Sequence, residues 1–251
     1  MQPDPKRRFS NRAEYYAAFR PKYPESLVDY MRERLALSPR SLVADVGSGT
    51  GILTELFLNN GNTVFSVEPN DDMRGAAEAR LGSHPAFRSV NGSAESTTLA
   101  NASVDFITAA QSFHWFRPKE TKIEFRRILR PSGWVVLIWN TRKASTAFLQ
   151  GYENLVAWLT SKGKAVVKHE HITPQAISEF LGRYEAVKLE SSQQLGLKGL
   201  VGRLTSASYS PLPSDPLYGE MVRRAEELFQ QYQQDGFVRL EYWTEVYASQ
   251  P

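Results

Sequence analysis

The pattern of hydrophobic and polar positions changes repeatedly between residues 41 and 140. Short runs rich in β-branched residues, typical of buried strands, alternate with longer segments whose apolar positions recur at helical spacing. The pattern predicts strands at residues 41–46, 63–67, 86–90, 104–110 and 133–139. Helices are predicted between them at residues 52–60, 71–81 and 119–129. Strands that alternate with helices in this way predict a doubly wound, mostly parallel α/β sheet with right-handed crossovers.

The remainder of the chain predicts more helices and two more strands. Residues 12–19, 25–37, 141–182 and 218–234 are mainly helical in pattern, whereas residues 184–195 and 236–247 alternate as strands. We therefore expect a seven-stranded sheet with an antiparallel C-terminal strand and a helical cap over its carboxyl edge. An aromatic and aliphatic stripe in the third of these helical segments predicts core packing; it is formed by Phe148, Tyr152, Leu155 and Leu159.

Four units follow from this pattern. Residues 1–40 form an N-terminal helical cap segment, and residues 41–140 form the core that holds a ligand. Residues 141–182 form a helical cap insertion, and residues 183–251 complete the sheet and its helices.

Composition excludes several classes of protein. The 251 residues are 41% hydrophobic and 23% charged, which is ordinary globular usage, and the absence of cysteine excludes disulfides, thiolate metal sites and cysteine nucleophiles. A net charge of +3, with its one basic cluster at Lys6, Arg7 and Arg8, is too small to favour a nucleic-acid partner. No apolar run approaches the ~20 residues of a membrane span. Without an apolar run near the N-terminus to indicate a signal peptide, we expect a soluble, cytoplasmic protein.

A glycine-rich loop joins the first predicted strand to the first predicted helix. It reads Asp45-Val-Gly47-Ser48-Gly49-Thr-Gly51, and glycines at such a turn let the backbone approach a ligand at a helix N-terminus. The even spacing of the glycines differs from the G-x-G-x-x-G of dinucleotide sites. Glu68 ends the next strand, where a carboxylate can accept both hydroxyls of a ribose. This arrangement predicts an adenosine ligand without a 2′-phosphate and does not by itself separate NAD from other adenosine ligands.

The motifs resemble those of a known family. Residues 43–51 and 67–73 resemble the first two motifs of class I S-adenosylmethionine-dependent methyltransferases, which have a Rossmann-like sheet, and residues 91–95 and 104–116 resemble later motifs. The run Gln111-Ser-Phe-His-Trp-Phe116 is similar to the type 11 small-molecule subgroup that includes trans-aconitate methyltransferase-like proteins. The resemblance covers residues 9–140 well and residues 236–247 loosely, and residues 141–235 show no specific match.

The resemblance implies a cofactor, an acceptor class and a set of contacts. The cofactor would be S-adenosyl-L-methionine, and the acceptor a small molecule. Asp45 would lie near the amino group of the cofactor, Glu68 would hold the ribose, Met73 would pack on adenine, and Gln111 would contact the methionine end. Ser93 stands where many relatives carry an aspartate. The full implied cofactor-binding set is Arg20, Asp45, Gly47, Ser48, Gly49, Gly51, Glu68, Pro69, Met73, Ser93, Ala94 and Gln111.

Methyl transfer requires mainly that the acceptor be placed in line with the methyl group, at ~3–3.5 Å, with water excluded. A carboxylate acceptor needs no base, whereas a hydroxyl, an amine or a carbon acid can need one. His114 is the candidate base, because an imidazole has an ordinary pKa near ~6.5; a role in shaping the pocket stays open for it. Trp115 either lines the acceptor site or covers the edge of the sheet. Arg20 could bind the carboxylate of the cofactor or an acidic acceptor.

Other functions compete with this interpretation. A non-catalytic S-adenosylmethionine-binding module would keep the same motifs. An NAD-dependent oxidoreductase is disfavoured by the glycine spacing and by the lack of a Tyr-x-x-x-Lys or comparable acid. His169 and His171 lack a third ligand at a suitable spacing, so we expect no metal site. We expect no nucleic-acid or membrane partner, and the sequence does not distinguish a monomer from a homodimer.

Overall fold

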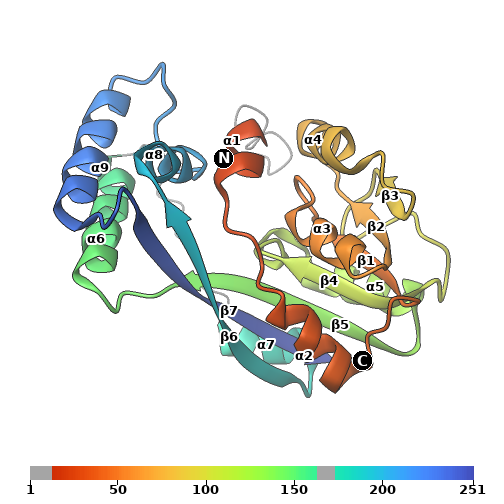
Figure 1. Ribbon diagram of the computed structural model, residues 1–251. Coiled ribbons are helices and arrows are strands. Elements are labelled where there is room, and N and C mark those ends of the chain that lie inside the picture. The colour runs from red at the N-terminus through yellow and green to blue at the C-terminus, as the bar shows by residue number, and fades with distance from the viewer. Residues whose placement is uncertain (1–12, 163–172) are drawn as a thin grey trace.

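The computed structural model describes residues 13–162 and 173–251 and shows a three-layer α/β fold with a helical cap (Figure 1). In the described residues one sheet has the strand order β3-β2-β1-β4-β5-β7-β6. Strand β7 is antiparallel to both of its neighbours, and the other strands are parallel to one another. This confirms the predicted seven-stranded, mostly parallel sheet with an antiparallel C-terminal strand. The strands are β1 Leu42–Val46, β2 Thr63–Val67, β3 Phe87–Val90, β4 Val104–Ala110, β5 Leu129–Arg142, β6 Glu185–Leu195 and β7 Val238–Ser249.

Helices cover both faces of the sheet because each presents an apolar stripe to it. On one face, α2 (Ser26–Leu35), α3 (Ile52–Asn59) and α4 (Asp71–Leu81) share a buried cluster with side chains of the sheet. On the other face, α5 (Pro118–Ile128) and α7 (Pro174–Leu181) do the same. Helix α4 has the bounds that the sequence predicts, with the side chain of Asn70 accepting a hydrogen bond from the Met73 N–H at its start.

The cap has a hydrophobic cluster of its own. It is built from α6 (Ala147–Lys162), α8 (Leu197–Thr205) and α9 (Tyr218–Tyr232), together with the ends of β6 and β7 that meet them. Figure 1 shows these two long strands running out of the sheet to the cap helices. The predicted stripe on α6 is confirmed as core: Phe148, Tyr152, Leu155 and Leu159 are all buried in this cluster.

Three local features differ from the sequence prediction. Helices α2 and α7 lie on the faces of the sheet, so they are not part of the cap that we expected from residues 1–40 and 141–182. Helix α8 was not predicted, because Gly199 and Gly202 weaken its helical pattern. Strand β5 begins earlier than predicted, since Leu129 pairs with Val104 before the chain leaves the ladder and returns to it at Trp134.

Helix α1 (Ala13–Phe19) joins the N-terminal segment to the cap. A Cβ atom at Gly202 of α8 would lie 2.6 Å from the ring of Phe19, so only a glycine lets the two helices approach this closely. The side chain of Gln193, on β6, donates a hydrogen bond to the Phe19 carbonyl oxygen at 3.0 Å. These contacts fix the residues after α1 beside the carboxyl edge of the sheet.

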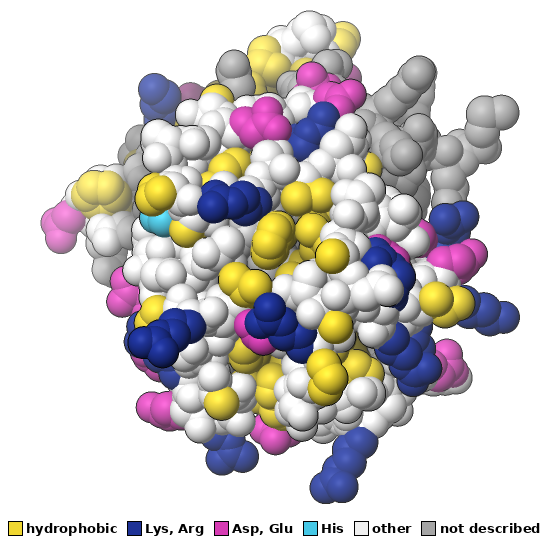
Figure 2. Space-filling view, turned by 90° about the vertical axis from the view of Figure 1, so that its right-hand side faces the viewer, with side chains coloured by type: hydrophobic (Ala, Val, Ile, Leu, Met, Phe, Trp, Pro, Cys, Tyr) yellow, Lys and Arg dark blue, Asp and Glu magenta, His cyan; other side chains and the backbone are white. Residues whose placement is uncertain are grey.

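The surface of the described residues mixes charges. On the face that Figure 2 shows, basic and acidic side chains are interspersed, and hydrophobic side chains gather toward the middle. No helix in the described part of the chain is both long enough and apolar enough to cross a membrane.

Candidate active site

A cavity of about 700 Å³ opens at the carboxyl edge of the parallel strands, between the sheet and the cap. This volume lies in the range of small-molecule sites. The loops after β1, β2, β4 and β5 line it on one side, and residues of α1, α6 and α8 line it on the other. Of the site residues predicted from the sequence, those lining it are Arg20, Asp45, Gly47, Ser48, Gly49, Glu68, Pro69, Met73, Ser93, Ala94, Gln111, His114 and Trp115.

The three glycines of the loop have different roles, although all have a positive φ. A Cβ atom at Gly47 would lie 2.6 Å from the Ser112 Cβ, so this glycine lets the loop after β4 pack against the loop after β1. A Cβ atom at Gly49 would meet no atom within 4 Å, so this glycine borders open space in the cavity. Gly51 does not line the cavity. It precedes α3, and its Cβ would lie 2.7 Å from the Leu81 Cδ1, so it lets α3 pack against α4.

Glu68 is held in place by backbone donors. Its Oε2 accepts a hydrogen bond from the Gly49 N–H and its Oε1 accepts one from the Asn70 N–H, both at 2.9 Å. The residue is only 8% exposed, and burial raises the pKa of its carboxyl, although these two N–H groups and Arg74 oppose the shift. Each carboxylate oxygen has a second lone pair. Glu68 can therefore accept two further hydrogen bonds from the cavity, as two neighbouring hydroxyls would require.

Asp45 lies deeper, at the end of β1. Its Oδ2 accepts a hydrogen bond from the Thr54 hydroxyl at 2.7 Å, and its Oδ1 accepts one from the Thr108 hydroxyl at 3.2 Å. Burial raises the pKa of Asp45 to about 6; the two hydroxyls oppose this shift and the nearby Glu68 adds to it. A cation bound beside Asp45 would favour its ionised form.

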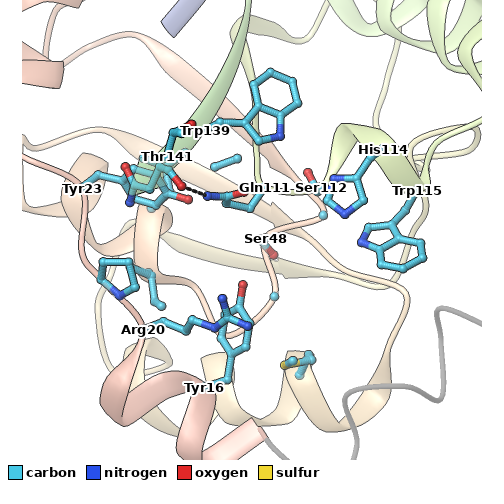
Figure 3. Close-up of a pocket in the computed structure, with 18 of the residues that line it drawn as sticks. Tyr16, Arg20, Tyr23, Ser48, Gln111, Ser112, His114, Trp115, Trp139 and Thr141 are labelled. Carbon is cyan, nitrogen blue, oxygen red and sulfur yellow. Dashed lines mark hydrogen bonds between the residues drawn. The ribbon is translucent and has the colours of Figure 1, made fainter. Parts of the chain in front are cut away.

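Gln111 has a strained backbone at the edge of the cavity. Its φ is 54°, which is unusual for a residue other than glycine. Its side-chain Nε2 donates a hydrogen bond to the Asn140 carbonyl oxygen at 3.0 Å, as Figure 3 shows. The side chain of Asn140 in turn accepts a hydrogen bond from the Thr244 hydroxyl at 2.6 Å. The Gln111 amide is thus fixed between the ends of β4 and β5.

His114 and Trp115 lie on a short 3₁₀ helix, Phe113–Trp115, that follows β4. Their ring centroids are 4.8 Å apart, and Figure 3 shows both residues together on one side of the cavity, away from Tyr16 and Arg20. Phe113 anchors this turn, because its buried ring packs against Phe180 of α7 at a centroid distance of 4.5 Å. The turn therefore presents the imidazole and the indole to the cavity on a rigid base.

The turn after β3 carries a carboxylate that the sequence analysis did not single out. Glu95 lines the cavity beside Ser93 and Ala94 and accepts a hydrogen bond from the Arg117 N–H at 2.9 Å. Burial would raise the pKa of Glu95, but hydrogen bonds from Arg117 and Ser93 outweigh it and lower the pKa overall. An ionised acceptor therefore stands next to Ser93.

The residues that β5 and the cap contribute to the cavity wall were also not predicted from the sequence. Asn140, Thr141 and Arg142 follow the buried part of β5, so the rule that ligands bind at the carboxyl ends of parallel strands could have found them. Arg203 and Tyr209 also line the cavity, but they lie in a region without a recognisable motif. The remaining wall residues in this group are Glu153, Glu245 and Tyr247.

In the described residues no group of three or more histidine, aspartate or glutamate side chains could hold a metal ion. His169 and His171, and the basic cluster Lys6, Arg7 and Arg8, lie outside the described residues.

Comparison with known proteins gives a consistent result. Residues 44–137 match a family model described as a methyltransferase domain. An uncharacterised methyltransferase of Mycobacterium tuberculosis is 35% identical over 134 residues, which are 53% of this chain and 52% of that protein. An uncharacterised methyltransferase-like protein of Schizosaccharomyces pombe is 28% identical over 164 residues, or 65% of this chain and 59% of that protein. The chain thus spans about half the length of the curated relatives it matches.

Solved structures share the fold over nearly the whole chain. A protein named as a type II methyltransferase from Anaeromyxobacter dehalogenans has a TM-score of 0.71 at 20% identity, covering 92% of this chain and 98% of that one. A protein named as a methyltransferase from an antibiotic biosynthesis pathway of Anabaena variabilis has a TM-score of 0.61 at 20% identity, covering 90% and 97%. Residues 44–137 are thus similar to a methyltransferase domain, and the described chain shares the fold of these solved structures.

Proposed function

We propose that the chain transfers a methyl group from S-adenosylmethionine to a small molecule bound between the sheet and the cap. The observation that carries this proposal is the single cavity wall that runs from the glycine loop and Glu68, past Gln111 and His114, to the cap residues. The first part of this wall suits a nucleoside with an amino-acid tail, and the rest would border the acceptor in the same cavity.

The residues present fit the cofactor. Gly49 leaves open the space that a side chain would fill, and Glu68 keeps two acceptor positions beside it. Met73 and Pro69 would pack on adenine, and Glu95 would supply for the adenine amine the carboxylate acceptor that an aspartate in place of Ser93 would offer. Asp45 would face the ammonium group. S-adenosylmethionine, when bound, supplies a methyl group on a positively charged sulfur, and that sulfur becomes a neutral thioether when the methyl moves to the nucleophilic atom of the acceptor.

The cavity walls would position the acceptor and exclude water, the main requirements of an in-line displacement. Gln111 would fix the methionine end of the cofactor, because its amide is held by the Asn140 carbonyl. His114 would accept a proton if the attacking group is a hydroxyl or an amine, and Trp115 would form the apolar wall beside it. A carboxylate acceptor would need no proton removal, and His114 would then only shape the pocket.

A small-molecule acceptor is also supported by the resemblance of residues 111–116 to the trans-aconitate methyltransferase-like subgroup. A cavity of about 700 Å³ bordered by α1, α6 and α8 suits a ligand of limited size. Tests of this proposal should therefore begin with small acceptors.

The decisive experiment is a calorimetric titration of the protein with S-adenosylmethionine, S-adenosylhomocysteine and NAD, followed by an acceptor screen with a methyl-labelled donor. Micromolar binding of the first two ligands, with label recovered in a small-molecule product, is the expected result. Binding of the first two without any labelled product across the screen would favour a non-catalytic binding module. Binding of NAD alone would contradict the proposal.

A further inference from the structure

Three arginines line the cap side of the cavity, and only one of them has a carboxylate partner among the described residues. Arg142 binds Glu153 through two nitrogens, with its Nη2 3.1 Å from the Glu153 Oε2. Arg20 donates one hydrogen bond, from Nη2 to the Ser206 carbonyl oxygen at 3.1 Å, and its buried Nε has no partner. Arg203 has two buried nitrogens, Nε and Nη1, that bond no atom of the described protein.

Arg203 is the more unusual of the two unpaired cations. It is only 3% exposed, it lies on α8, and it lines the cavity. Burial lowers the pKa of Arg203, but the tyrosines 242, 152 and 209 outweigh it and raise the pKa, while the cation of Arg142 opposes them; no carboxylate is among these groups. A guanidinium that is buried without a counter-charge is costly, because water no longer solvates it. Such a group is expected where a ligand brings the opposite charge.

The two unpaired arginines share neighbours in the cap, and Arg20 also reaches toward Asp45. Tyr23 lies within electrostatic range of both Asp45 and Arg20, which places Arg20 toward the cofactor end. Tyr152 and Tyr209 act on both arginines, and Arg203 has Tyr242 as a further neighbour. The two guanidinium groups also affect each other: burial lowers the pKa of Arg20, and the charge of Arg203 lowers it further. One carboxylate, that of the methionine part of the cofactor, can neutralise only one of them.

Resting on the proposed methyltransferase function, we propose that Arg203 forms an anion-binding subsite for the acceptor. The acceptor would then be a small molecule with a carboxylate or phosphate group. Arg203 binds that group with its fork of N–H donors, while Arg20 takes the carboxylate of the cofactor. Because the subsite is lined by tyrosines and shielded from water, the interaction is stronger than that of an arginine on the surface.

The test uses simple anions on the full-length chain, with and without saturating S-adenosylhomocysteine, at constant ionic strength. Succinate and inorganic phosphate are the probes, and neutral succinamide is the matched uncharged control. Calorimetry gives the affinity and thermal denaturation gives the shift in Tm. We expect succinate, phosphate or both to bind and to raise Tm, and succinamide to do neither. The stronger of the two anions identifies the acidic group.

Two variants separate the roles of the arginines. Arg203→Met should weaken anion binding by ~10-fold or more and leave the affinity for S-adenosylhomocysteine nearly unchanged. Arg20→Met should instead weaken the binding of S-adenosylhomocysteine. Arg88→Met, on the opposite edge strand β3, is the matched control and should change neither affinity. If Arg203→Met does not fold, Arg203→Lys keeps the charge without the planar fork and should still lower the anion affinity.

The inference is wrong if the wild-type chain binds S-adenosylhomocysteine but neither anion, or if Arg203→Met binds both anions like the wild type. If S-adenosylhomocysteine itself does not bind, the proposed function fails. The anion titration without it then still decides whether Arg203 forms an anion site.

Discussion

At the scale of single residues, Glu68 is the clearest example of a side chain that the backbone prepares for a ligand. Two N–H groups orient its carboxylate, and its remaining lone pairs face the cavity. We expect Glu68→Ala to weaken S-adenosylhomocysteine binding by ~1.5–3 kcal/mol, because charge-assisted hydrogen bonds to two hydroxyls are lost. Calorimetry measures the change, with the exposed Glu120→Ala as control. An unchanged affinity would remove Glu68 from the site.

Asp45 should release a proton when the cofactor binds. Burial raises the pKa of its carboxyl to about 6 in the free protein, so part of the population is protonated near that pH. The ammonium group of the cofactor favours the ionised form and lowers this pKa, so bound protons are released. We expect release of roughly half a proton per ligand at pH 6 and ~0.1 at pH 7, because a group with a pKa near 6 is half ionised at pH 6.

Calorimetry of S-adenosylhomocysteine binding in buffers with different ionisation enthalpies measures this proton release. Asp45→Asn should abolish the pH-dependent part of the proton release, and its side chain still has room for the contacts with the Thr54 and Thr108 hydroxyls. Equal proton release in the variant and the wild type would show that another group titrates.

His114 should affect turnover more than binding, if the acceptor has a proton to lose. His114→Ala removes the group that would accept it, and general-base catalysis typically contributes ~10²–10⁴-fold. We expect kcat to fall by that order while the affinity for S-adenosylhomocysteine is kept. Trp115→Phe, which keeps an aromatic wall on the same turn, serves as the control. A His114→Ala enzyme with full kcat would leave His114 as a packing residue.

At the scale of elements, the two loop glycines Gly47 and Gly49 should respond differently to a methyl group. Gly47→Ala and Gly49→Ala both impose a left-handed conformation on an L-residue, which costs ~1–2 kcal/mol. Only at Gly47 would the new Cβ also overlap Ser112, at 2.6 Å, which adds ~1–3 kcal/mol. Urea denaturation should therefore give a lower midpoint for Gly47→Ala than for Gly49→Ala. Equal midpoints would mean that the loop after β4 moves away from the new methyl group without lowering the free energy of unfolding.

The elements were largely predictable, because local patterns decide them. The strands β1, β2 and β4 and the helix α4 lie at the residues that the hydrophobic periodicity and the helix-capping residues predict. Helix α8 was missed, since Gly199 and Gly202 have low helical propensity and the contact with Phe19 that requires Gly202 lies far away in the sequence. The cavity residues in the loops after β1, β2 and β4 were predictable for the same local reason, whereas those of the cap wall were not. The position of Arg203 depends on tertiary packing, which no local sequence motif predicts.

At the scale of the whole molecule, the site depends on how closely α1 and the cap approach each other. Phe19 packs on Gly202, and the next residue, Arg20, donates its hydrogen bond to Ser206 at the end of the same cap helix. Displacing α1 would therefore withdraw Arg20 and Tyr16 from the cavity together, although neither has been changed. We therefore expect the proposed cofactor end of the site to be sensitive to a substitution on a helix of the cap.

Gly202→Ala tests this coupling. The new Cβ would lie 2.6 Å from the Phe19 ring, so α1 must shift, and we expect S-adenosylhomocysteine affinity to fall roughly tenfold. Adding Phe19→Leu to Gly202→Ala makes room for the methyl group and should recover part of the affinity. Gly219→Ala on α9, where a Cβ meets no atom within 4 Å, is the matched control and should bind like the wild type. If Gly202→Ala binds normally, the cap can accommodate the methyl group without moving Arg20, and the cofactor site is held by the sheet alone.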